Sequence, residues 1–310
     1  MKTILLVGGY GFLGVNILKY IEDSLKGNYQ VIVFDKFPTN RSNLVLGCVT
    51  KSYTGDFSDP MLLERIFAEN EINLVIHSLS TTVPSMSFNA RYDVESNLIP
   101  TIELLNCMER HQVKDIVYIS SGGAIYGVSS SEKHKENEDV FPISSYGVVK
   151  LAIEKYLMQY SELFDFRPLI LRLSNPYGPY HYSKQQGIIN VAVDAALSGD
   201  PFVVWGSGDA KKDYIYVTDF VNILFALLDK GVNGMVINVG SGKLASVNEI
   251  LCRIRGLVPS FVWSYGTASQ YDVSQFELNM DKLHAIIGDY HFVDLDEGLK
   301  RVLEWKNDLL

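Results

Sequence analysis

The sequence predicts an α/β protein in which helices cover both faces of a parallel sheet. Short apolar runs that suit buried parallel strands, such as residues 3–7 and 74–77, alternate with segments of helical spacing. The first run enters a glycine-rich turn, residues 8–14, which opens a helical pattern. The 310 residues are enough for one large domain or two smaller ones.

The glycine-rich turn predicts a dinucleotide site. Gly8 suits a tight turn, Gly11 lets a pyrophosphate approach the backbone at the helix N-terminus, and Gly14 lets the helix pack closely on the strand. We assign Phe12 and Leu13, between these glycines, to the same site. The alternative is a glycine-rich turn that serves helix packing only.

A second apolar run, residues 30–34, ends in Asp35, about 20 residues beyond the glycines. A carboxylate there accepts hydrogen bonds from both ribose hydroxyls and repels a 2′-phosphate, so NAD is favoured over NADP. Strand, glycine turn, helix and downstream acid together predict a Rossmann-type doubly wound sheet. Further residues assigned to the cofactor are Lys36, Asp56, Phe57, Leu79, Ser80, Asn97, Ser120, Tyr146 and Lys150.

Three of the polar residues near the predicted cofactor site have open alternatives. Asp56 accepts from the adenine amino group or caps the following helix, for which Ser58 or Asp59 is better placed. Asn97 supports the neighbouring active-site backbone or faces water. His77, at a strand end, is interpreted as a structural hydrogen bonder.

The run from Asp115 to Gly127, followed by Tyr146 and Lys150, is where we place the chemistry. Tyr146 and Lys150 lie four residues apart and share one helix face, which sets an ammonium beside a phenol. A phenolate near neutral pH requires the phenol pKa to fall by roughly 3 units, or about 4 kcal/mol, which a nearby cation and a cationic cofactor favour. The hydroxyl of Ser121 is placed to hold the same substrate oxygen. A Tyr-x-x-x-Lys pair alone also occurs on exposed helices.

The remaining sequence predicts a second lobe. After a sixth strand, residues 168–173, the segment Asn175-Pro-Tyr-Gly-Pro breaks the α/β rhythm. We therefore predict an NAD-binding domain over residues 1–174, to which strands and a helix near 203–240 return. Residues 175–310 form mainly a smaller C-terminal α/β substrate-binding lobe.

Composition and charge exclude several classes of protein. The 27 basic and 36 acidic residues give a formal net charge of −9, which argues against a nucleic-acid or anionic-membrane surface. Cys48, Cys107 and Cys252 are scattered and odd in number, so we expect neither a disulfide scaffold nor a metal site. The sequence contains no apolar stretch of 18 residues. We expect a cytoplasmic protein without a membrane span.

The glycines, Asp35, Ser121, Tyr146-x-x-x-Lys150 and Asn175-Pro-Tyr-Gly-Pro, in this order and spacing, resemble the extended short-chain dehydrogenase/reductase family along essentially the whole chain. The likeness is closest to sugar-nucleotide epimerases of the UDP-galactose 4-epimerase type. It implies that Tyr146 is the acid/base, that Lys150 binds the nicotinamide ribose and lowers the tyrosine pKa, and that Ser121 holds the reacting hydroxyl. It also implies a homodimer through the helices near Asn97 and Tyr146.

The resemblance also has departures. Some family members place the reacting hydroxyl where this chain has Gly122, and we favour Ser121. The dehydratases carry an Asp-Glu pair after that hydroxyl, where this chain has glycine and alanine, so dehydration is less favoured. A diphosphate-binding Arg of the epimerases is replaced by Lys212, and a second is missing from residues 269–273. Phe276 either limits the sugar's C2 substituent or is a core residue.

The resulting hypothesis is an NAD-dependent sugar-nucleotide epimerase that acts on a UDP-hexose by transient oxidation at C4. The residues assigned to the nucleotide-sugar substrate are Thr82, Ser121, Tyr146, Asn175 and Lys212. Two alternatives stay open. One is an NAD(P)H-dependent 4-keto-sugar-nucleotide reductase or a dehydratase, and the other is a nucleotide-sensing protein that kept the fold without turnover.

Overall fold

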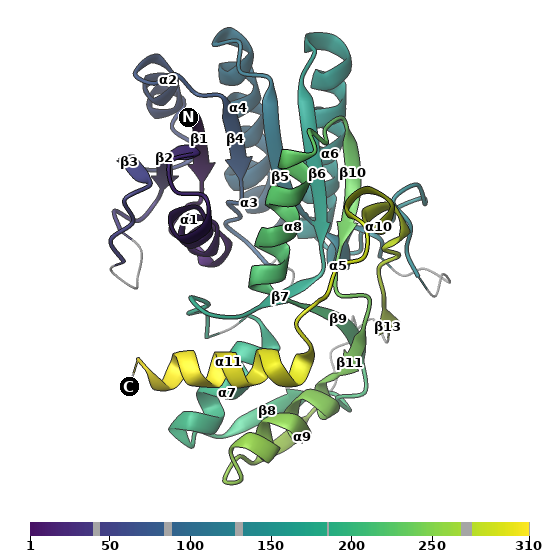
Figure 1. Cartoon of the computed structure of the whole chain (residues 1–310). Coiled ribbons are helices and arrows are strands. Elements are labelled where there is room, and N and C mark those ends of the chain that lie inside the picture. The colour runs from purple at the N-terminus through teal and green to yellow at the C-terminus, as the bar shows by residue number, and fades with distance from the viewer. Residues whose placement is uncertain (40–43, 84–88, 128–132, 185, 268–274, 310) are drawn as a thin grey trace.

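The computed structural model describes residues 1–39, 44–83, 89–127, 133–184, 186–267 and 275–309. They form two lobes, a large one built on a seven-stranded sheet and a smaller one that lies beyond the carboxyl ends of its strands (Figure 1). Within these residues no helix is both long and apolar enough to cross a membrane.

The large sheet is parallel throughout and confirms the predicted fold class. In spatial order its strands are β3 (Val49–Thr54), β2 (Tyr29–Asp35), β1 (Lys2–Val7), β4 (Leu74–His77), β5 (Asp115–Ser121), β6 (Arg167–Leu173) and β10 (Met235–Val239). The strand order reverses between β1 and β4. Ligands bind at such a switch point because the loops after the two strands diverge there.

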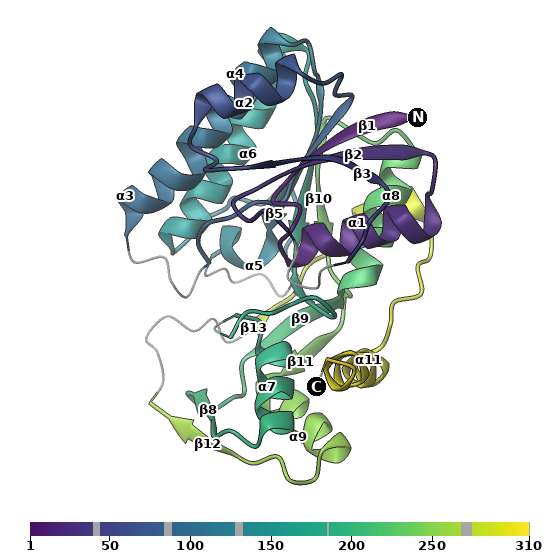
Figure 2. The same cartoon turned by 90° about the vertical axis from the view of Figure 1, so that its left-hand side faces the viewer.

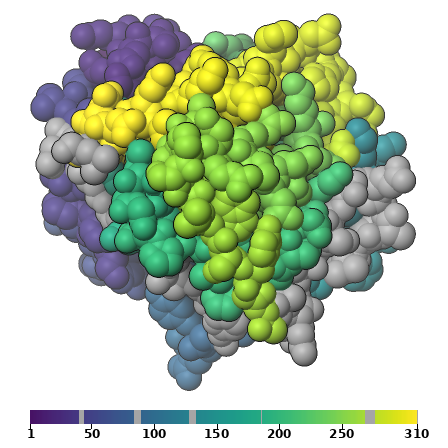
Figure 3. Space-filling view, turned by 90° about the horizontal axis from the view of Figure 1, so that it is seen from below, coloured from purple at the N-terminus to yellow at the C-terminus, as the bar shows by residue number. Residues whose placement is uncertain are grey.

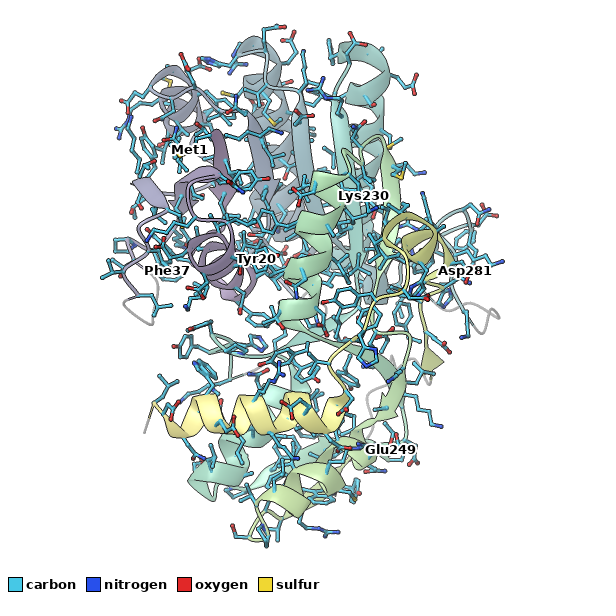
Figure 4. All side chains as sticks on the ribbon, viewed as in Figure 1. Met1, Tyr20, Phe37, Lys230, Glu249 and Asp281 are labelled. Atoms are coloured by element: carbon cyan, nitrogen blue, oxygen red, sulfur yellow. The ribbon has the colours of Figure 1, made fainter. Side chains whose placement is uncertain are left out.

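Helices cover both faces of this sheet (Figure 2). One face carries α1 (Phe12–Ser24) and α8 (Val217–Asp229), and the other carries α2 (Pro60–Ala68), α4 (Ile99–Arg110) and α6 (Ser145–Phe164). Successive side chains of a strand point to opposite faces, so Ile4 and Leu6 pack toward α1 while Leu5 and Val7 pack toward α2. Tyr20 of α1 stacks on Phe225 of α8, with ring centroids 5.1 Å apart (Figure 4).

The helix ends follow the sequence signals. Asp59 caps α2 by accepting hydrogen bonds from the backbone N–H of Met61 and Leu62 at 3.0 and 3.2 Å, which leaves Asp56 free of that role. Between β4 and α4 the chain forms the short α3 (Ala90–Asp93) and a π-helical turn, η2 (Val94–Leu98). π-helical turns are rare in proteins, and those that occur often lie at functional sites.

The smaller lobe contains two short sheets and three helices. Strands β7 (Asn175–Tyr177), β9 (Lys211–Tyr216), β11 (Leu244–Ser246) and β13 (Gln275–Phe276) form one sheet, and β8 (Phe202–Trp205) pairs with β12 (Trp263–Gly266). Around them pack α7 (Ile188–Ser198), α9 (Val247–Leu257) and α11 (Leu295–Asn307). Seen from below, α11 lies across this lobe beside α9 (Figure 3). The short α5 (Gly122–Ile125) follows β5, and α10 (Asp281–Ile287) packs on β10.

Within residues 203–240, α8 and β10 lie in the large lobe, whereas β8 and β9 pair within the smaller one. This corrects the expectation that the strands of this region return together, because β9 is held between β7, β11 and β13. The buried carboxylate of Asp213 on β9 accepts from the backbone N–H of Ser241 and Gly242, at 2.8 and 3.0 Å, just beyond β10. Asp213 therefore ties the smaller lobe to the large sheet.

Candidate active site

The glycine turn after β1 leaves the N-terminus of α1 open to a ligand. Gly8 has a φ of 81°, which a side chain disfavours, and a Cβ on Gly14 would collide with the carbonyl oxygen of Gly8. Gly11, the residue before α1, has no side chain that could cap the helix. No capping side chain from this position therefore accepts from the first N–H groups of α1, at Phe12 and Leu13. This geometry suits a pyrophosphate.

Asp35 lies at the end of β2 beside this turn. Its carboxylate accepts from the backbone N–H of Tyr10 at 2.9 Å and of Phe37 at 3.1 Å, which fixes its orientation. With Asp35, the predicted residues Lys36, Asp56, Phe57 and Leu79 line a cleft of ≈ 240 Å³. The acidic edge of this cleft suits the ribose hydroxyls of an adenosine.

Three further residues that line this cleft were not identified from the sequence. Tyr92, Glu95 and Ser96, from α3 and η2, also line it. Their i, i+3, i+4 spacing on one helix face is a signal that could have grouped them, but nothing in the sequence showed which face it was.

Asn97 supports the loop after β4, which decides between its two alternatives. Its Oδ1 accepts from the backbone N–H of Thr81 at 2.9 Å, and its Nδ2 donates to the Thr81 hydroxyl at 2.7 Å. Asn97 is buried and lies in the π-helical turn. It therefore holds the loop that carries Leu79, Ser80 and Thr82.

Ser121, Tyr146 and Lys150 meet at the carboxyl end of β5. The Tyr146 hydroxyl is hydrogen-bonded to the side chains of Ser121 and Ser80. The Lys150 Nζ lies 5.7 Å from the centroid of the Tyr146 ring and donates to the carbonyl of Ile119 at 3.0 Å. The residues that the sequence singled out for chemistry are thus brought together.

The pKa values within this group differ from the sequence expectation. Burial raises the pKa of Tyr146 to about 12, although its hydrogen bonds to Ser121 and Ser80 lower it. Burial lowers the pKa of Lys150 to about 8, and the carboxylate of Glu154 raises it. Desolvation of the phenolate therefore dominates, and the protein's own groups keep Tyr146 protonated at neutral pH.

Ser120 is also placed differently from its cofactor assignment. Its hydroxyl donates to Glu154 at 2.6 Å, and Glu154 forms a buried ion pair with Arg172 at 2.8 Å. The Ser120 side chain is therefore directed into the protein interior and supports the end of β5. Sequence alone did not show this, because the partner residues are 34 and 52 positions away.

A small cavity of ≈ 10 Å³ lies behind Tyr146, lined in part by His77, Thr82, Tyr118 and Lys150. His77 Nε2 lies 3.0 Å from the Thr101 hydroxyl. Burial and the charge of Lys150 lower the pKa of His77 to about 3, which keeps it neutral as a structural hydrogen bonder should be. The Tyr118 hydroxyl, buried and without a hydrogen-bond partner among the described residues, was not anticipated.

Comparison with known proteins identifies the family. The model of the NAD dependent epimerase/dehydratase family matches residues 4–240. The chain belongs to this family. It is 32% identical over 308 residues to a putative UDP-glucose 4-epimerase of Methanocaldococcus jannaschii, with 97% of each chain covered. It is also 30% identical over 260 residues to a dTDP-D-glucose 4,6-dehydratase of Dictyostelium discoideum, covering 78% of this chain and 58% of that protein.

Solved structures of family members have the same fold. The UDP-glucose 4-epimerase of Thermotoga maritima, solved with UDP-glucose, superimposes with a TM-score of 0.91 at 27% identity over 99% of both chains. The UDP-glucose 4-epimerase of Thermus thermophilus, solved with NAD, gives 0.90 at 26% identity over 100% of both chains. NAD is the cofactor of the family and of this protein, and the open N-terminus of α1, Asp35 and the adjoining cleft fit it.

Asn175 and Lys212, which were assigned to the substrate from the sequence, lie on the neighbouring strands β7 and β9. The Asn175 side chain donates to the carbonyl of Asp213 at 2.8 Å, and Lys212 is half-buried opposite Phe276 in the β9 and β13 pairing. Phe276 is buried and stacks on His134 with ring centroids 5.3 Å apart, which supports its interpretation as a core residue. Residues 269–273, where the sequence lacks the second arginine, lie outside the described residues.

One group of potential metal ligands was also missed in the sequence. Ligand atoms of Glu64, Cys107 and His111 lie within 4.8 Å of one another on α2 and at the end of α4. The spacing Cys107-x-x-x-His111 was the available signal. The Arg110 guanidinium contacts Glu64 at 2.7 Å, and burial raises the pKa of the Cys107 thiol to about 12. Both oppose a cation, so we interpret the group as an ion-pair cluster.

Proposed function

We propose that this protein is an NAD-dependent sugar-nucleotide epimerase that interconverts the C4 configuration of a UDP-hexose. The observation that carries the proposal is a single acid/base pair, Tyr146 with Lys150, beside the dinucleotide site. Among the described residues, no carboxylate lines the cavity at Tyr146, and α5, which follows Ser121, contains only glycine, alanine and isoleucine. Elimination of water would require a second acid/base.

In this proposal Tyr146 accepts the proton of the sugar 4-hydroxyl and later returns it to the same oxygen. Ser121 donates a hydrogen bond to that oxygen, and Lys150 places positive charge near the phenol. Bound NAD supplies the acceptance of hydride from C4 and its return to the opposite face. Atoms and electrons balance over the cycle, because the proton and the hydride both return to the sugar.

We assign the ligands as follows. Residues proposed to hold NAD are Gly8, Gly11, Phe12, Leu13, Gly14, Asp35, Lys36, Asp56, Phe57, Leu79, Ser80, Asn97, Tyr146 and Lys150, with Ser120 contributing through its backbone. Thr82, Ser121, Tyr146, Asn175 and Lys212 are proposed to contact the sugar nucleotide. The NAD-binding domain comprises residues 1–174 with α8 and β10, and the rest of 175–310 forms the substrate lobe.

We also propose that the protein acts as a homodimer through α4 and α6. Ile99 on α4, and Val148 and Leu163 on α6, expose 48%, 51% and 63% of their surface. Large apolar side chains at such exposures on two adjacent helices suit a contact with a second copy.

Proton NMR of the anomeric signals tests the proposal. The protein, incubated with NAD and UDP-glucose, is expected to produce UDP-galactose, and Tyr146→Phe is expected to lower kcat by about 10²–10⁴-fold because it removes the acid/base. Tyr265→Phe, on an exposed strand of the smaller lobe, serves as the matched control. A panel of UDP-, dTDP-, GDP- and CDP-sugars identifies the nucleotide. No interconversion of any of them overturns the proposal.

A second candidate is a 4-keto-sugar-nucleotide reductase, supported by a relative, the dTDP-4-dehydro-6-deoxyglucose reductase of Escherichia coli, which is 25% identical over 97% of this chain. A reductase would consume added NADH stoichiometrically with a 4-keto-sugar nucleotide. The fall in absorbance at 340 nm separates it from the epimerase, which regenerates its cofactor in each cycle. If neither activity is detected, a nucleotide-sensing role gains support.

A further inference from the structure

We propose that Ser80 is a positioning residue for Tyr146, and that its hydroxyl turns to donate a hydrogen bond to the phenolate form of that tyrosine. The inference deepens the proposed function, because it rests on Tyr146 acting as the acid/base. It gives the tyrosine two hydroxyl partners, Ser121 on one side and Ser80 on the other.

The two serines reach Tyr146 from neighbouring strands. Ser121 ends β5, and Ser80 lies three residues beyond the end of β4, which pairs with β5 in parallel register. Ser80 and Tyr146 line the same small cavity, and the hydrogen bonds of both serines to the Tyr146 hydroxyl lower its pKa. The carboxyl ends of two adjacent parallel strands thus place one hydroxyl on either side of the phenol.

The loop that carries Ser80 is held in place by other residues. The adjacent Thr81 is bonded through its backbone and its hydroxyl to Asn97 of the π-helical turn, at 2.9 and 2.7 Å. Ser78, two residues earlier, donates to the carbonyl of Val7 at 2.9 Å. The backbone of Ser80 is therefore fixed on both sides, and its side chain is exposed.

The hydrogen-bond directions show what Ser80 does in each state. Its Oγ donates to the carbonyl of Thr82 at 2.9 Å, and a carbonyl can only accept. While Tyr146 is protonated, Ser80 therefore directs its own proton at Thr82 and has only a lone pair to offer the phenol. When Tyr146 has lost the phenol proton, rotation about the Ser80 Cβ–Oγ bond turns the serine hydroxyl from the Thr82 carbonyl to the phenolate oxygen.

This arrangement stabilises the charged form more than the neutral form. A hydrogen bond to an ionised acceptor is roughly twice as strong as a neutral one, so the turn exchanges a weak bond for a strong one. The phenolate needs such a donor because the hydrogen bond of the Lys150 ammonium goes to the carbonyl of Ile119. Burial meanwhile raises the pKa of Tyr146 to about 12. A donor that follows the ionisation of the phenol offsets part of that desolvation.

The test measures the ionisation of Tyr146 directly and therefore does not depend on turnover. Protein labelled with ¹³Cζ-tyrosine and saturated with NAD is titrated by NMR, and Tyr146→Phe assigns the resonance. Ser80→Ala is expected to raise the Tyr146 pKa by about one unit, since it removes one charge-assisted hydrogen bond. Ser80→Thr keeps the hydroxyl and is expected to restore the wild-type value. Ser264→Ala, the same substitution at an exposed position of β12 in the smaller lobe, is expected to leave it unchanged.

Turnover supplies an independent measurement. On UDP-glucose, the acid limb of the kcat profile of Ser80→Ala is expected to move up by the same pH interval, with about tenfold lower kcat below it and equal kcat above it. If Ser80 only contacted the cofactor, Ser80→Ala would change the NAD affinity without moving the acid limb of the kcat profile. A Tyr146 resonance that titrates identically in Ser80→Ala and wild type, or that stays neutral to pH 11 in both, overturns the inference. If the resonance shifts while no sugar nucleotide is converted, the proposed epimerase fails and the role of Ser80 stands.

Discussion

Removal of the Glu154 carboxylate is expected to destabilise the protein strongly. Glu154 accepts from Ser120 at 2.6 Å and from the Arg172 Nη2 at 2.8 Å, and 3% and 5% of the Glu154 and Arg172 side chains are exposed. Arg172 also donates to the Tyr126 hydroxyl at 3.0 Å. Glu154→Ala leaves a buried guanidinium without its counterion and the Ser120 hydroxyl without its acceptor.

The magnitude follows from that loss. Breaking one side of a buried ion pair costs roughly 3–5 kcal/mol, because the remaining charge stays desolvated. The matched control is Glu297→Ala, which breaks the exposed Arg301–Glu297 pair at 2.8 Å on α11, where the side chains are 45% and 48% exposed. A pair of that kind contributes about 0.5 kcal/mol or less.

Urea unfolding of the NAD-loaded protein, followed by tryptophan fluorescence, measures the difference. We expect a much lower midpoint for Glu154→Ala at an unchanged slope, and a midpoint close to wild type for Glu297→Ala. The double variant Glu154→Met with Arg172→Met is expected to recover most of the loss, since it removes the unpaired charge as well. Equal midpoints for the two single variants, or a double variant no more stable than Glu154→Ala, would refute the reasoning.

Three further outcomes are expected. Gly14→Ala should abolish NAD binding measured by calorimetry, because its Cβ would collide with the Gly8 carbonyl oxygen; retained affinity would contradict the close packing of α1. Asp35→Ala should weaken NAD binding and narrow its preference over NADP, as direct titration of both cofactors would show; an unchanged ratio would contradict the ribose assignment. Lys150→Met should raise the free energy of unfolding at pH 7 by up to about 3 kcal/mol, less the bond to Ile119, since burial lowers the pKa of Lys150 from 10.5 to about 8. The wild type gains stability as the pH rises from about 8 toward 10.5, because in this window the folded lysine has released its proton and the unfolded lysine has not. The difference in unfolding free energy between wild type and Lys150→Met should therefore close over that window. A constant difference would argue against a buried charged lysine.

The sequence predicted those parts of the fold that depend on local patterns. Apolar runs ending in Gly8, Asp35 and Ser121 marked strands whose carboxyl ends meet at one edge, and the large sheet has that form. The better helix cap was also visible, because Asp59 directly precedes the α2 pattern. The sequence did not predict to which sheets β8 and β9 belong, since the residues of a short strand do not indicate which strand it pairs with.

The parts of the site that sequence did not predict depend on long-range partners. Ser120 and Ser121 are neighbours with the same chemistry, yet one bonds to Glu154 and the other to Tyr146, which lie at different positions of α6. Which of the two hydroxyls belongs to the site depends on how α6 packs on β5, and that packing exists only in the folded protein. The sequence predicted Tyr118 only as a strand residue. Its place beside the cavity was missed, because that cavity also forms only in the folded protein.

The charge balance at Tyr146 determines when it can act as a base. A pKa of about 12 lies about 5 units above neutral pH, which corresponds to roughly 7 kcal/mol. The hydrogen bonds of Ser80 and Ser121, which lower the pKa, are already included in that value, and Lys150 directs a proton at the Ile119 carbonyl. The rest of the stabilisation has to come from positive charge brought in beside the phenol with the oxidised cofactor. In the proposed mechanism Tyr146 is therefore a neutral hydrogen bonder in the protein alone and becomes a base only when the dinucleotide site is filled, which would restrict proton abstraction to complexes able to accept the hydride.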